Sequence, residues 1–262
     1  MNDRKSIFIT GAASGIGRET ALLFAKNGWF VGISDVNESG LKNLETRIGK
    51  ENCFFGVMDV TVPESVRKGF DAFAEKTDGK LDVLLNNAGI VKFGLFENVD
   101  LEIHHRIVDI NLKGCLSCAY YAMKYLKQTQ GSRIINMSSA SSIYGLPDLS
   151  VYSATKHALS AMTEALNLEM ERHGVYVCDI KPPYVNTPLL EVNEDVFSIS
   201  KMGIRMESGK VAETVWKASH RDKLHWNIGA TASLAFLCWL MPFAQRFIVK
   251  MLTIPSEEGG RS

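Results

Sequence analysis

The sequence has no excess of charge of either sign, because its 29 lysine and arginine residues are matched by 29 aspartate and glutamate residues. A neutral chain offers no particular attraction to a polyanion, so we expect no nucleic acid among its partners. The sequence also shows no secretory apolar region, since residues 1–6 are polar and lead directly into the apolar residues 7–9. We therefore expect no signal peptide and a cytoplasmic protein.

Cysteines are few, and their odd number and dispersed positions (53, 115, 118, 178 and 238) argue against a disulfide framework. Cys115 and Cys118 form a C-x-x-C pair, but no second pair or histidine cluster completes a zinc site, and we expect no metal. Small buried helix residues are the favoured interpretation of this pair, with redox or metal chemistry as the alternative. Neighbouring His104 and His105 face different ways on a helix, and we expect both at the surface.

Internal repeats and low-complexity segments are absent as well. Six apolar segments alternate instead with helical ones; they are residues 7–10, 30–34, 53–58, 81–85, 133–137 and 175–180. This alternation predicts an α/β fold with a Rossmann-type, doubly wound parallel sheet of six to seven strands, the seventh from residues 223–228. We expect one domain over residues 1–228, with a substrate lid at about 188–208, and an apolar helical extension over 229–262.

A glycine-rich turn follows the first predicted strand and precedes a helix. Its spacing, G-x-x-x-G-x-G, is carried by Gly11, Gly15 and Gly17, with Ser14 and Ile16 between them. Glycines let the backbone turn sharply and approach a pyrophosphate, and the free N–H groups at the helix start then face that anion. The turn therefore predicts a dinucleotide site, whereas a plain glycine turn is the alternative.

Two acidic residues follow the next two predicted strands. Asp35 lies at the distance from the glycine turn at which a carboxylate accepts hydrogen bonds from an adenosine ribose, and it would repel a 2′-phosphate. This favours NAD over NADP, although Asp35 is also suited to capping a loop. Asp59 and Val60 fit two interpretations equally on spacing: contact with an adenine, or a cap on the helix that starts near Pro63.

Small and amide residues, Asn87, Ala88 and Gly89, follow the fourth strand and would let a ligand approach the backbone. Asn111 stands inside a long helical region, where asparagine is unfavourable, so a polar task is expected of it. Because ligands bind beyond the carboxyl ends of parallel strands, these positions are expected to meet at one edge of the sheet.

Tyr152 and Lys156 are four residues apart and therefore share one face of a predicted helix. An ammonium group close to a phenol favours the phenolate, as an acid–base catalyst requires. Ser139 precedes this pair by about one loop, at the end of the fifth strand.

These motifs, in this order, resemble the short-chain dehydrogenase/reductase family over about residues 5–190. They are Thr10-Gly11-x-x-x-Gly15-Ile16-Gly17, Asp59-Val60, Asn86-Asn87-Ala88-Gly89, Asn111, Ser139, Tyr152-x-x-x-Lys156 and the proline turn that ends at Thr187. The resemblance implies an enzyme that transfers hydride between NAD and an alcohol or ketone. One departure is Pro182-Pro183, where the family often has Pro-Gly; proline lacks an N–H donor there.

The resemblance also implies a role for each site residue. Tyr152 would exchange the proton with the substrate oxygen, Ser139 would hydrogen-bond that oxygen, and Asn111 would position a water. Lys156 would hold the nicotinamide ribose and favour the phenolate. Thr187 and the backbone near Val185 would fix the carboxamide, and the family pattern makes adenine contact the preferred role of Asp59 and Val60. We expect a homodimer or homotetramer.

Residues 228–244 carry no charge, and Arg246 and Lys250 follow them. This segment is slightly short for a bilayer span and is interrupted by Pro242. It would pack on its own domain or a second subunit, rest on a membrane surface through residues 228–252, or span the membrane, in decreasing order of preference. By analogy with the family we expect a bulky apolar, lipid- or steroid-like substrate. The alternatives are an NADP-dependent carbonyl reductase and a non-catalytic NAD-binding scaffold.

Overall fold

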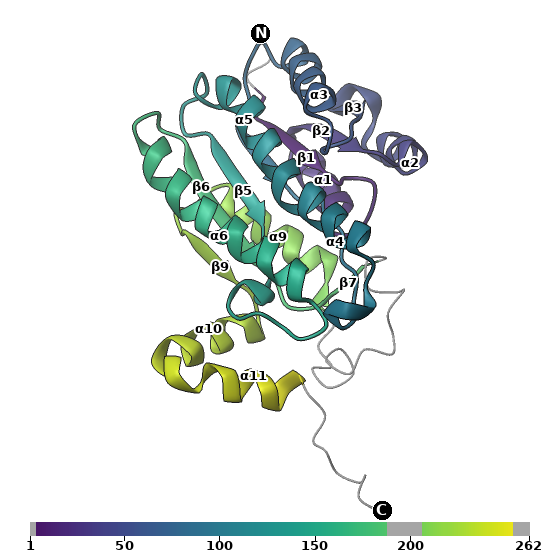
Figure 1. Ribbon diagram of the computed structural model, residues 1–262. Helices are drawn as coiled ribbons and strands as arrows, with labels where there is room; N and C mark the ends of the chain where they lie inside the picture. Colours follow the sequence, from purple (N-terminus) through teal and green to yellow (C-terminus); the bar gives the residue numbers. More distant parts are fainter. Residues whose placement is uncertain (1–3, 188–205, 254–262) are drawn as a thin grey trace, which may run out of the picture.

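The computed structural model describes residues 4–187 and 206–253, in which a parallel sheet is covered by helices on both faces (Figure 1). In spatial order its strands are β3 (Cys53–Val57), β2 (Phe30–Asp35), β1 (Ser6–Thr10), β4 (Val83–Asn86), β5 (Arg133–Met137), β6 (Tyr176–Lys181) and β9 (His225–Asn227). The chain reverses its winding direction between β1 and β4, as in a doubly wound sheet. The predicted fold class is therefore confirmed.

The longer helices are α1 (Gly15–Lys26), α2 (Glu38–Ile48), α3 (Pro63–Lys76), α4 (Leu101–Val108), α5 (Cys115–Leu126), α6 (Ser150–Glu171), α9 (Ser208–Ala218), α10 (Ala230–Leu240) and α11 (Gln245–Thr253). Short 3₁₀ turns are η1 (Lys50–Asn52), η2 (Phe96–Asn98), η4 (Ala140–Ser142) and η5 (Pro242–Ala244). Helices α1, α2 and α9 pack on one face of the sheet, and α3, α5 and α6 pack on the other.

Strand β1 lies at the centre of the sheet and shows why the fold forms. Its residues alternate between faces: Ile7 and Ile9 enter one apolar core, and Phe8 enters the other. All three are fully buried, and burial of each stabilises the fold by about 2 kcal/mol. Phe8 packs against the rings of Phe70 and Phe73 in α3, at centroid distances of 4.5 and 5.2 Å.

All six predicted strands are present, and the predicted seventh is β9, which pairs with β6. A separate pair, β7 (Val185–Asn186) and β8 (Met206–Glu207), was not predicted. It holds the end of the proline turn against the start of α9. The predicted lid at 188–208 lies, up to residue 205, outside the described residues, and the boundary predicted after residue 228 falls between β9 and α10.

The long helical region predicted from residue 101 to 127 is divided into α4, a π-helical segment over Asp109–Gly114 (η3), and α5. The prediction of a surface position is wrong for His104, which is buried in α4 and stacks on Phe96, with its Nε2 3.0 Å from the Phe96 carbonyl oxygen. Neighbouring His105 is exposed, as predicted.

Cys115 and Cys118 are both buried in α5, and burial raises the pKa of both thiols. Cys118 packs in the core against α3 and β4 neighbours, which agrees with the favoured interpretation of the pair. Within residues 4–187 and 206–253, no three His, Cys, Asp or Glu side chains gather as they would around a metal ion.

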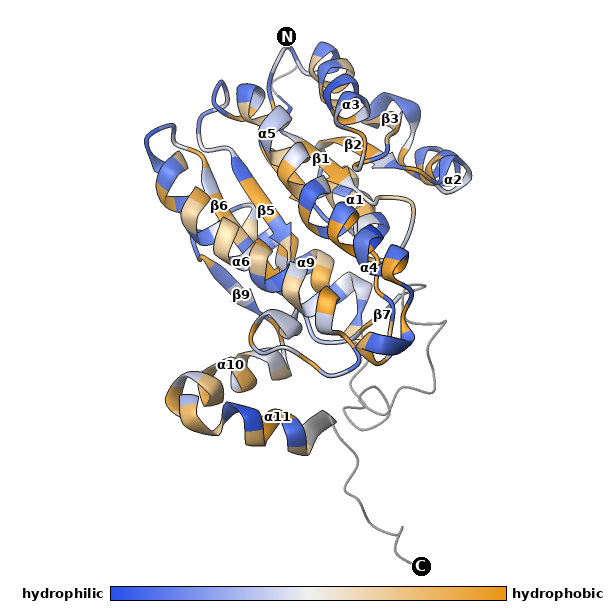
Figure 2. Ribbon diagram, in the orientation of Figure 1, coloured by the Kyte–Doolittle hydropathy of each residue, from blue (hydrophilic) through white to orange (hydrophobic). Residues whose placement is uncertain are grey.

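After β9 the chain forms α10 and α11, which turn away from the sheet (Figure 1). Figure 2 shows apolar residues around α10 and mixed apolar and polar residues on α11. None of the described helices is by itself long and apolar enough to cross a membrane. The segments Ala230–Leu240 and Pro242–Met251 satisfy the length and composition requirement only together, and they are bent by 107°.

Candidate active site

The glycine turn forms the floor of a site at the carboxyl ends of the strands. Gly11 and Gly15 have φ angles of +67° and +52°, in the left-handed region that side chains disfavour. A Cβ on Gly11 would lie 2.9 Å from the Ala88 Cα, and one on Gly17 would overlap the Gly11 carbonyl oxygen. Only glycine therefore lets the turn, the loop after β4 and the start of α1 pack this closely.

Thr10 and Asn87 tie the glycine turn to the loop after β4. The Thr10 Oγ1 accepts hydrogen bonds from the main-chain N–H groups of Asn87 and Ala88, at 3.1 and 3.0 Å. The Asn87 amide donates in return to the carbonyl oxygens of Thr10 and Gly11, both at 3.0 Å. The Asn87 side chain thus fixes the shape of the floor, and the residue also lines the cavity above it.

Asp35 ends β2 with its carboxylate held by main-chain donors. Its Oδ2 accepts from the Ala13 N–H and its Oδ1 from the Asn37 N–H, each at 3.0 Å. Each oxygen keeps a further lone pair for a ligand hydroxyl. The structure therefore presents Asp35 as a fixed acceptor beside the glycine turn, where the sequence places the ribose.

Asp59 lies in the turn before α3, but the N-cap of that helix is Val62 and receives no side-chain hydrogen bond, so the helix cap considered for Asp59 is not formed and the adenine contact stays a prediction. The Asp59 Oδ1 accepts instead from the Thr61 N–H at 2.9 Å and from the Thr61 hydroxyl at 2.7 Å, within that turn. Asp59 and Val60 also line a cavity of about 440 Å³ that includes Asp35, and Arg106 of α4 lines it too. The hydrogen bonds to Thr61 and a contact with a ligand in this cavity are compatible.

A second cavity, also of about 440 Å³, lies over the glycine turn and reaches Tyr152. The two cavities share Gly11, Asp35, Ala88 and Gly89, so they form one trough across the strand ends. A trough of this shape suits an elongated ligand with two ends, as a dinucleotide is. We call the cavity that contains Tyr152 the reaction cavity.

Tyr152, Lys156 and Ser139 meet in the reaction cavity. Lys156 is almost fully buried on α6, with its Nζ 5.5 Å from the Tyr152 ring centroid and donating to the Met137 carbonyl oxygen at 2.8 Å. Two of its three N–H donors are left for other acceptors. Ser139 lies two residues after the end of β5 and is the N-cap of η4, and its Oγ accepts from the Ser141 N–H at 3.2 Å.

Asn111 is fully buried in the π-helical segment, beside the trough. Its side-chain amide pairs with the main chain of Ile90, accepting from the N–H at 2.8 Å and donating to the carbonyl oxygen at 2.9 Å. The polar task expected of Asn111 is thus to anchor the loop after Gly89. Each end of the amide uses one hydrogen bond on Ile90, so one lone pair and one N–H remain, and the expected role of Asn111 in positioning a water stays a prediction.

Val185 and Thr187 bring the proline turn to the opposite wall of the trough. Val185 lies in β7 and, with Thr187, lines the reaction cavity. A Cβ on Gly15 would come within 3.1 Å of the Thr187 Cγ2, so this turn nearly touches the glycine turn. Pro182 accepts from the Ala140 N–H through its carbonyl oxygen at 2.9 Å, which holds the proline turn against η4.

The apolar wall of the reaction cavity was not predicted from the sequence. Around Tyr152 this wall consists of Val91, Phe93, Leu146, Leu149 and Tyr184. These residues come from loops without periodic patterning, and only the fold brings them together. The Ser141 hydroxyl also lines the cavity, is buried, and has no hydrogen-bond partner within the described part of the chain. It offers one polar contact inside an otherwise apolar wall.

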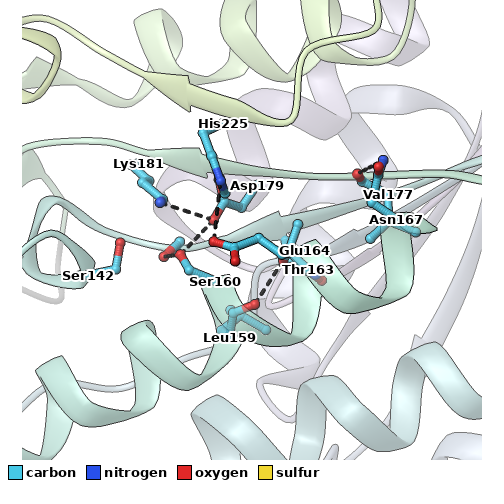
Figure 3. Close-up of polar contacts among 12 residues, drawn as sticks. Ser142, Leu159, Ser160, Thr163, Glu164, Asn167, Val177, Asp179, Lys181 and His225 are labelled. Atoms are coloured by element: carbon cyan, nitrogen blue, oxygen red, sulfur yellow. Dashed lines mark hydrogen bonds and ion pairs between the residues drawn. The ribbon is translucent and has the colours of Figure 1, made fainter. Parts of the chain in front are cut away.

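A buried polar cluster holds α6 against β6 and β9 (Figure 3). At its centre the fully buried Asp179 accepts from the Ser160 hydroxyl at 2.6 Å and contacts His225 Nδ1 at 2.8 Å. Lys181 Nζ lies 3.6 Å from the same carboxylate. The cluster continues through the Ser160 hydroxyl to Ser138, whose Oγ donates to the Lys156 carbonyl oxygen at 3.3 Å. It therefore fixes the helical turn that carries Lys156.

Replacing Asp179 by alanine is expected to lower the free energy of unfolding by about 3 kcal/mol, because Lys181 and His225 lose their shared buried anion. Urea denaturation followed by circular dichroism measures this loss. Glu164 is the matched control, since it contacts the other side of His225 at 3.4 Å from an exposed position. Glu164→Ala should cost less than about 0.5 kcal/mol; equal losses in both variants would contradict the importance of the buried cluster.

Comparison with known proteins agrees with this geometry. A family model described as short chain dehydrogenase matches residues 5–196. The 3beta-hydroxysteroid dehydrogenase of Mediterraneibacter gnavus is 36% identical over 194 residues, which cover 72% of this chain and 69% of that protein.

Two solved structures carry the same fold together with a nicotinamide cofactor. The 3-ketoacyl-(acyl-carrier-protein) reductase from Brucella melitensis, complexed with NADH, has a TM-score of 0.78 at 28% identity, covering 86% of this chain and 96% of that one. ElxO with NADP bound has a TM-score of 0.76 at 28% identity, covering 86% of this chain and 97% of that one.

The matched region contains the glycine turn, the Tyr152–Lys156 pair and every strand of the seven-stranded sheet except β9. The chain therefore belongs to the short-chain dehydrogenase/reductase family and is a nicotinamide-dependent oxidoreductase that acts on CH–OH groups.

Proposed function

We propose that this enzyme transfers hydride between NAD and a bulky apolar alcohol or ketone, of a lipid- or steroid-like class. The observation that carries the proposal is the reaction cavity itself, where an apolar wall encloses Tyr152, Ser139 and Lys156. A substrate that fills this wall with hydrocarbon would place one oxygen at the three polar groups. A scaffold that only binds a nucleotide has no use for that arrangement.

Three features of the trough suit a dinucleotide: the glycine turn, the start of α1 and the carboxylate of Asp35. Gly11, at the floor of the reaction cavity, brings no side chain into it, and the close packing at Gly11 and Gly17 holds the turn in the shape that lets a pyrophosphate approach the main chain. The N-cap of α1, Ser14, makes no side-chain hydrogen bond to the helix, and the first turn of α1 has no acidic residue. The main-chain N–H groups at the start of α1 can therefore face an anion. Asp35 is the residue that favours NAD, since its carboxylate suits a ribose hydroxyl and repels a phosphate.

In the proposed mechanism the bound nicotinamide supplies or accepts the hydride. Tyr152 gives the substrate oxygen a proton through its hydroxyl in reduction, and takes it back in oxidation. The Ser139 hydroxyl donates a hydrogen bond to the same oxygen and orients it. Lys156 keeps a positive charge near the phenol through its position under the Tyr152 ring, and its two remaining donors are available to cofactor hydroxyls.

Turnover of an alcohol panel tests the proposal. With NAD, cyclic secondary alcohols of steroid size should show kcat/KM at least about 30-fold above that of a short secondary alcohol, because they bury more hydrocarbon against Phe93 and Leu149. Absorbance of the reduced nicotinamide measures the rate. Equal kcat/KM across the panel would contradict the apolar substrate class.

Assembly into a homodimer or homotetramer is part of the proposal. Exposed apolar side chains on neighbouring helices support it: Leu116 and Tyr120 on α5, and Leu168 on α6. Apolar surface of this kind favours pairing with a second copy. The cytoplasmic location expected from the sequence stays a prediction.

A further inference from the structure

The largest exposed apolar side chains near the end of the described chain gather on α10, η5 and α11, residues 230–251, which we call the apolar hairpin. They are Phe236, Trp239, Leu240, Phe243, Phe247 and Met251. Trp239 is 76% exposed and Phe243 is 86% exposed. Single exposed apolar residues are common on protein surfaces. Six of them in one hairpin form an apolar patch, and such a patch is typical of a surface that binds a partner or a membrane.

The shape of the apolar hairpin is fixed by internal contacts. Gln245 Nε2 donates to the Cys238 carbonyl oxygen at 2.9 Å and closes the corner around Pro242. Cys238 and Val249 are buried on its inner side. Phe236 and Trp239 pack on each other with ring centroids 6.1 Å apart. The outward apolar side chains are therefore presented by an ordered corner.

Charge indicates what covers this surface. No aspartate or glutamate occurs from residue 228 to residue 255, whereas Arg246 and Lys250 stand four residues apart on one side of α11, both exposed. A tryptophan and two cations beside an apolar face fit an anionic lipid surface, where the rings enter the acyl boundary and the cations meet head groups.

A second copy of the chain fits this surface less well. In a two-fold symmetric contact each hairpin meets its equivalent, which brings the cations of both copies together with no acidic residue of the hairpin to pair them. A transmembrane span is also disfavoured, because the 107° bend leaves two short arms.

We propose that the apolar hairpin docks the enzyme on the surface of an anionic bilayer, with Trp239 and Phe243 inserted and with Arg246 and Lys250 at the head groups. The proposal goes beyond the function proposed above and does not depend on it. Membrane binding needs neither cofactor nor substrate.

The position of the hairpin gives this docking a consequence for access to the site. It directly follows Gly229, the N-cap of α10, where a Cβ would lie 3.2 Å from the Met206 Cε of β8. Strand β8 pairs with β7, whose Val185 lines the reaction cavity. Figure 1 shows the hairpin and β7 at the same end of the sheet. Docking would therefore bring the reaction-cavity end of the sheet close to the lipid, a consequence that rests on the proposed function.

Vesicle flotation of the full chain tests the proposal, with vesicles of phosphatidylcholine and phosphatidylglycerol and with phosphatidylcholine alone. The wild type should float with the anionic vesicles. The double variant Trp239→Glu/Phe243→Glu should reduce partitioning by about 30-fold, because it places carboxylates at the insertion points. Both positions are so exposed that the fold should tolerate the change.

Val57→Glu/Val62→Glu is the matched control. It adds the same two charges at exposed apolar positions around β3, at the opposite edge of the sheet from β9, and should float like the wild type. Arg246→Gln/Lys250→Gln should weaken binding to anionic vesicles by about 20-fold and binding to neutral vesicles little, and added salt should reproduce that loss.

Two outcomes would overturn the proposal: no flotation of the wild type with anionic vesicles, or flotation of Trp239→Glu/Phe243→Glu equal to that of the wild type. If the wild type does not float and light scattering shows a smaller oligomer for this variant, the hairpin is assigned to a subunit interface. Oxidation of a water-soluble alcohol without vesicles is measured in parallel. An enzyme inactive on every alcohol would contradict the proposed function and leave the flotation result intact.

Discussion

Replacing Tyr152 by phenylalanine is expected to lower kcat by about 1,000-fold, the largest effect that we expect of any single substitution. The substitution keeps the ring that packs near Phe93 and Leu149 and removes only the hydroxyl. Transfer of the proton to the substrate oxygen then has no side-chain donor in place, and general acid–base catalysis contributes about 100- to 10,000-fold to such rates. Steady-state turnover at saturating cofactor and alcohol measures the loss.

Two measurements show whether the loss arises from the proton transfer. Cofactor binding, followed through quenching of tryptophan fluorescence, should change less than about threefold, because the floor of the trough contains no atom of Tyr152. Tyr184→Phe is the matched control, since Tyr184 lines the same cavity and belongs to the same apolar wall. A comparable loss in Tyr184→Phe, or full activity in Tyr152→Phe, would show that Tyr152 is not the proton donor.

The fold and the floor of the site could be predicted from the sequence because the residues that determine them form local patterns along the chain. Gly11 and Gly17 are required by contacts within one turn and its neighbouring loop. The strand-end positions of Asp35 and Ser139 follow from parallel topology, which places all carboxyl ends of the strands at one edge. For the same reason the prediction that these residues gather along one trough agrees with the structure.

The residues that sequence reasoning missed act through partners far along the chain. Asp179 looked like one position of an apolar strand, and its partner His225 lies 46 residues away on β9. The polar task of Asn111 was expected, but its partner Ile90 is 21 residues upstream in a loop without a pattern. His104 was misplaced because it stacks on Phe96, in a short turn whose packing has no periodic signature.

Asp35 decides between the two nicotinamide cofactors in the proposed function, and Asp35→Asn is expected to raise the kcat/KM ratio of NADP to NAD by roughly 100-fold, or about 2.8 kcal/mol. The substitution keeps the size of the side chain and one acceptor oxygen, so one of the bonds from Ala13 and Asn37 is kept. It removes the negative charge that a 2′-phosphate would face. Initial rates with each cofactor at varied concentration give the ratio.

Asp59→Asn is the control, because Asp59 lines the same cavity while its Oδ1 is engaged by Thr61. This variant should weaken both cofactors alike, with a change of less than about threefold in the ratio. A wild type that prefers NADP, or a ratio that Asp35→Asn leaves unchanged, would contradict the assignment of Asp35. Arg106, which lines this cavity from α4, would then be the residue to substitute next, since a guanidinium is the group that binds a 2′-phosphate.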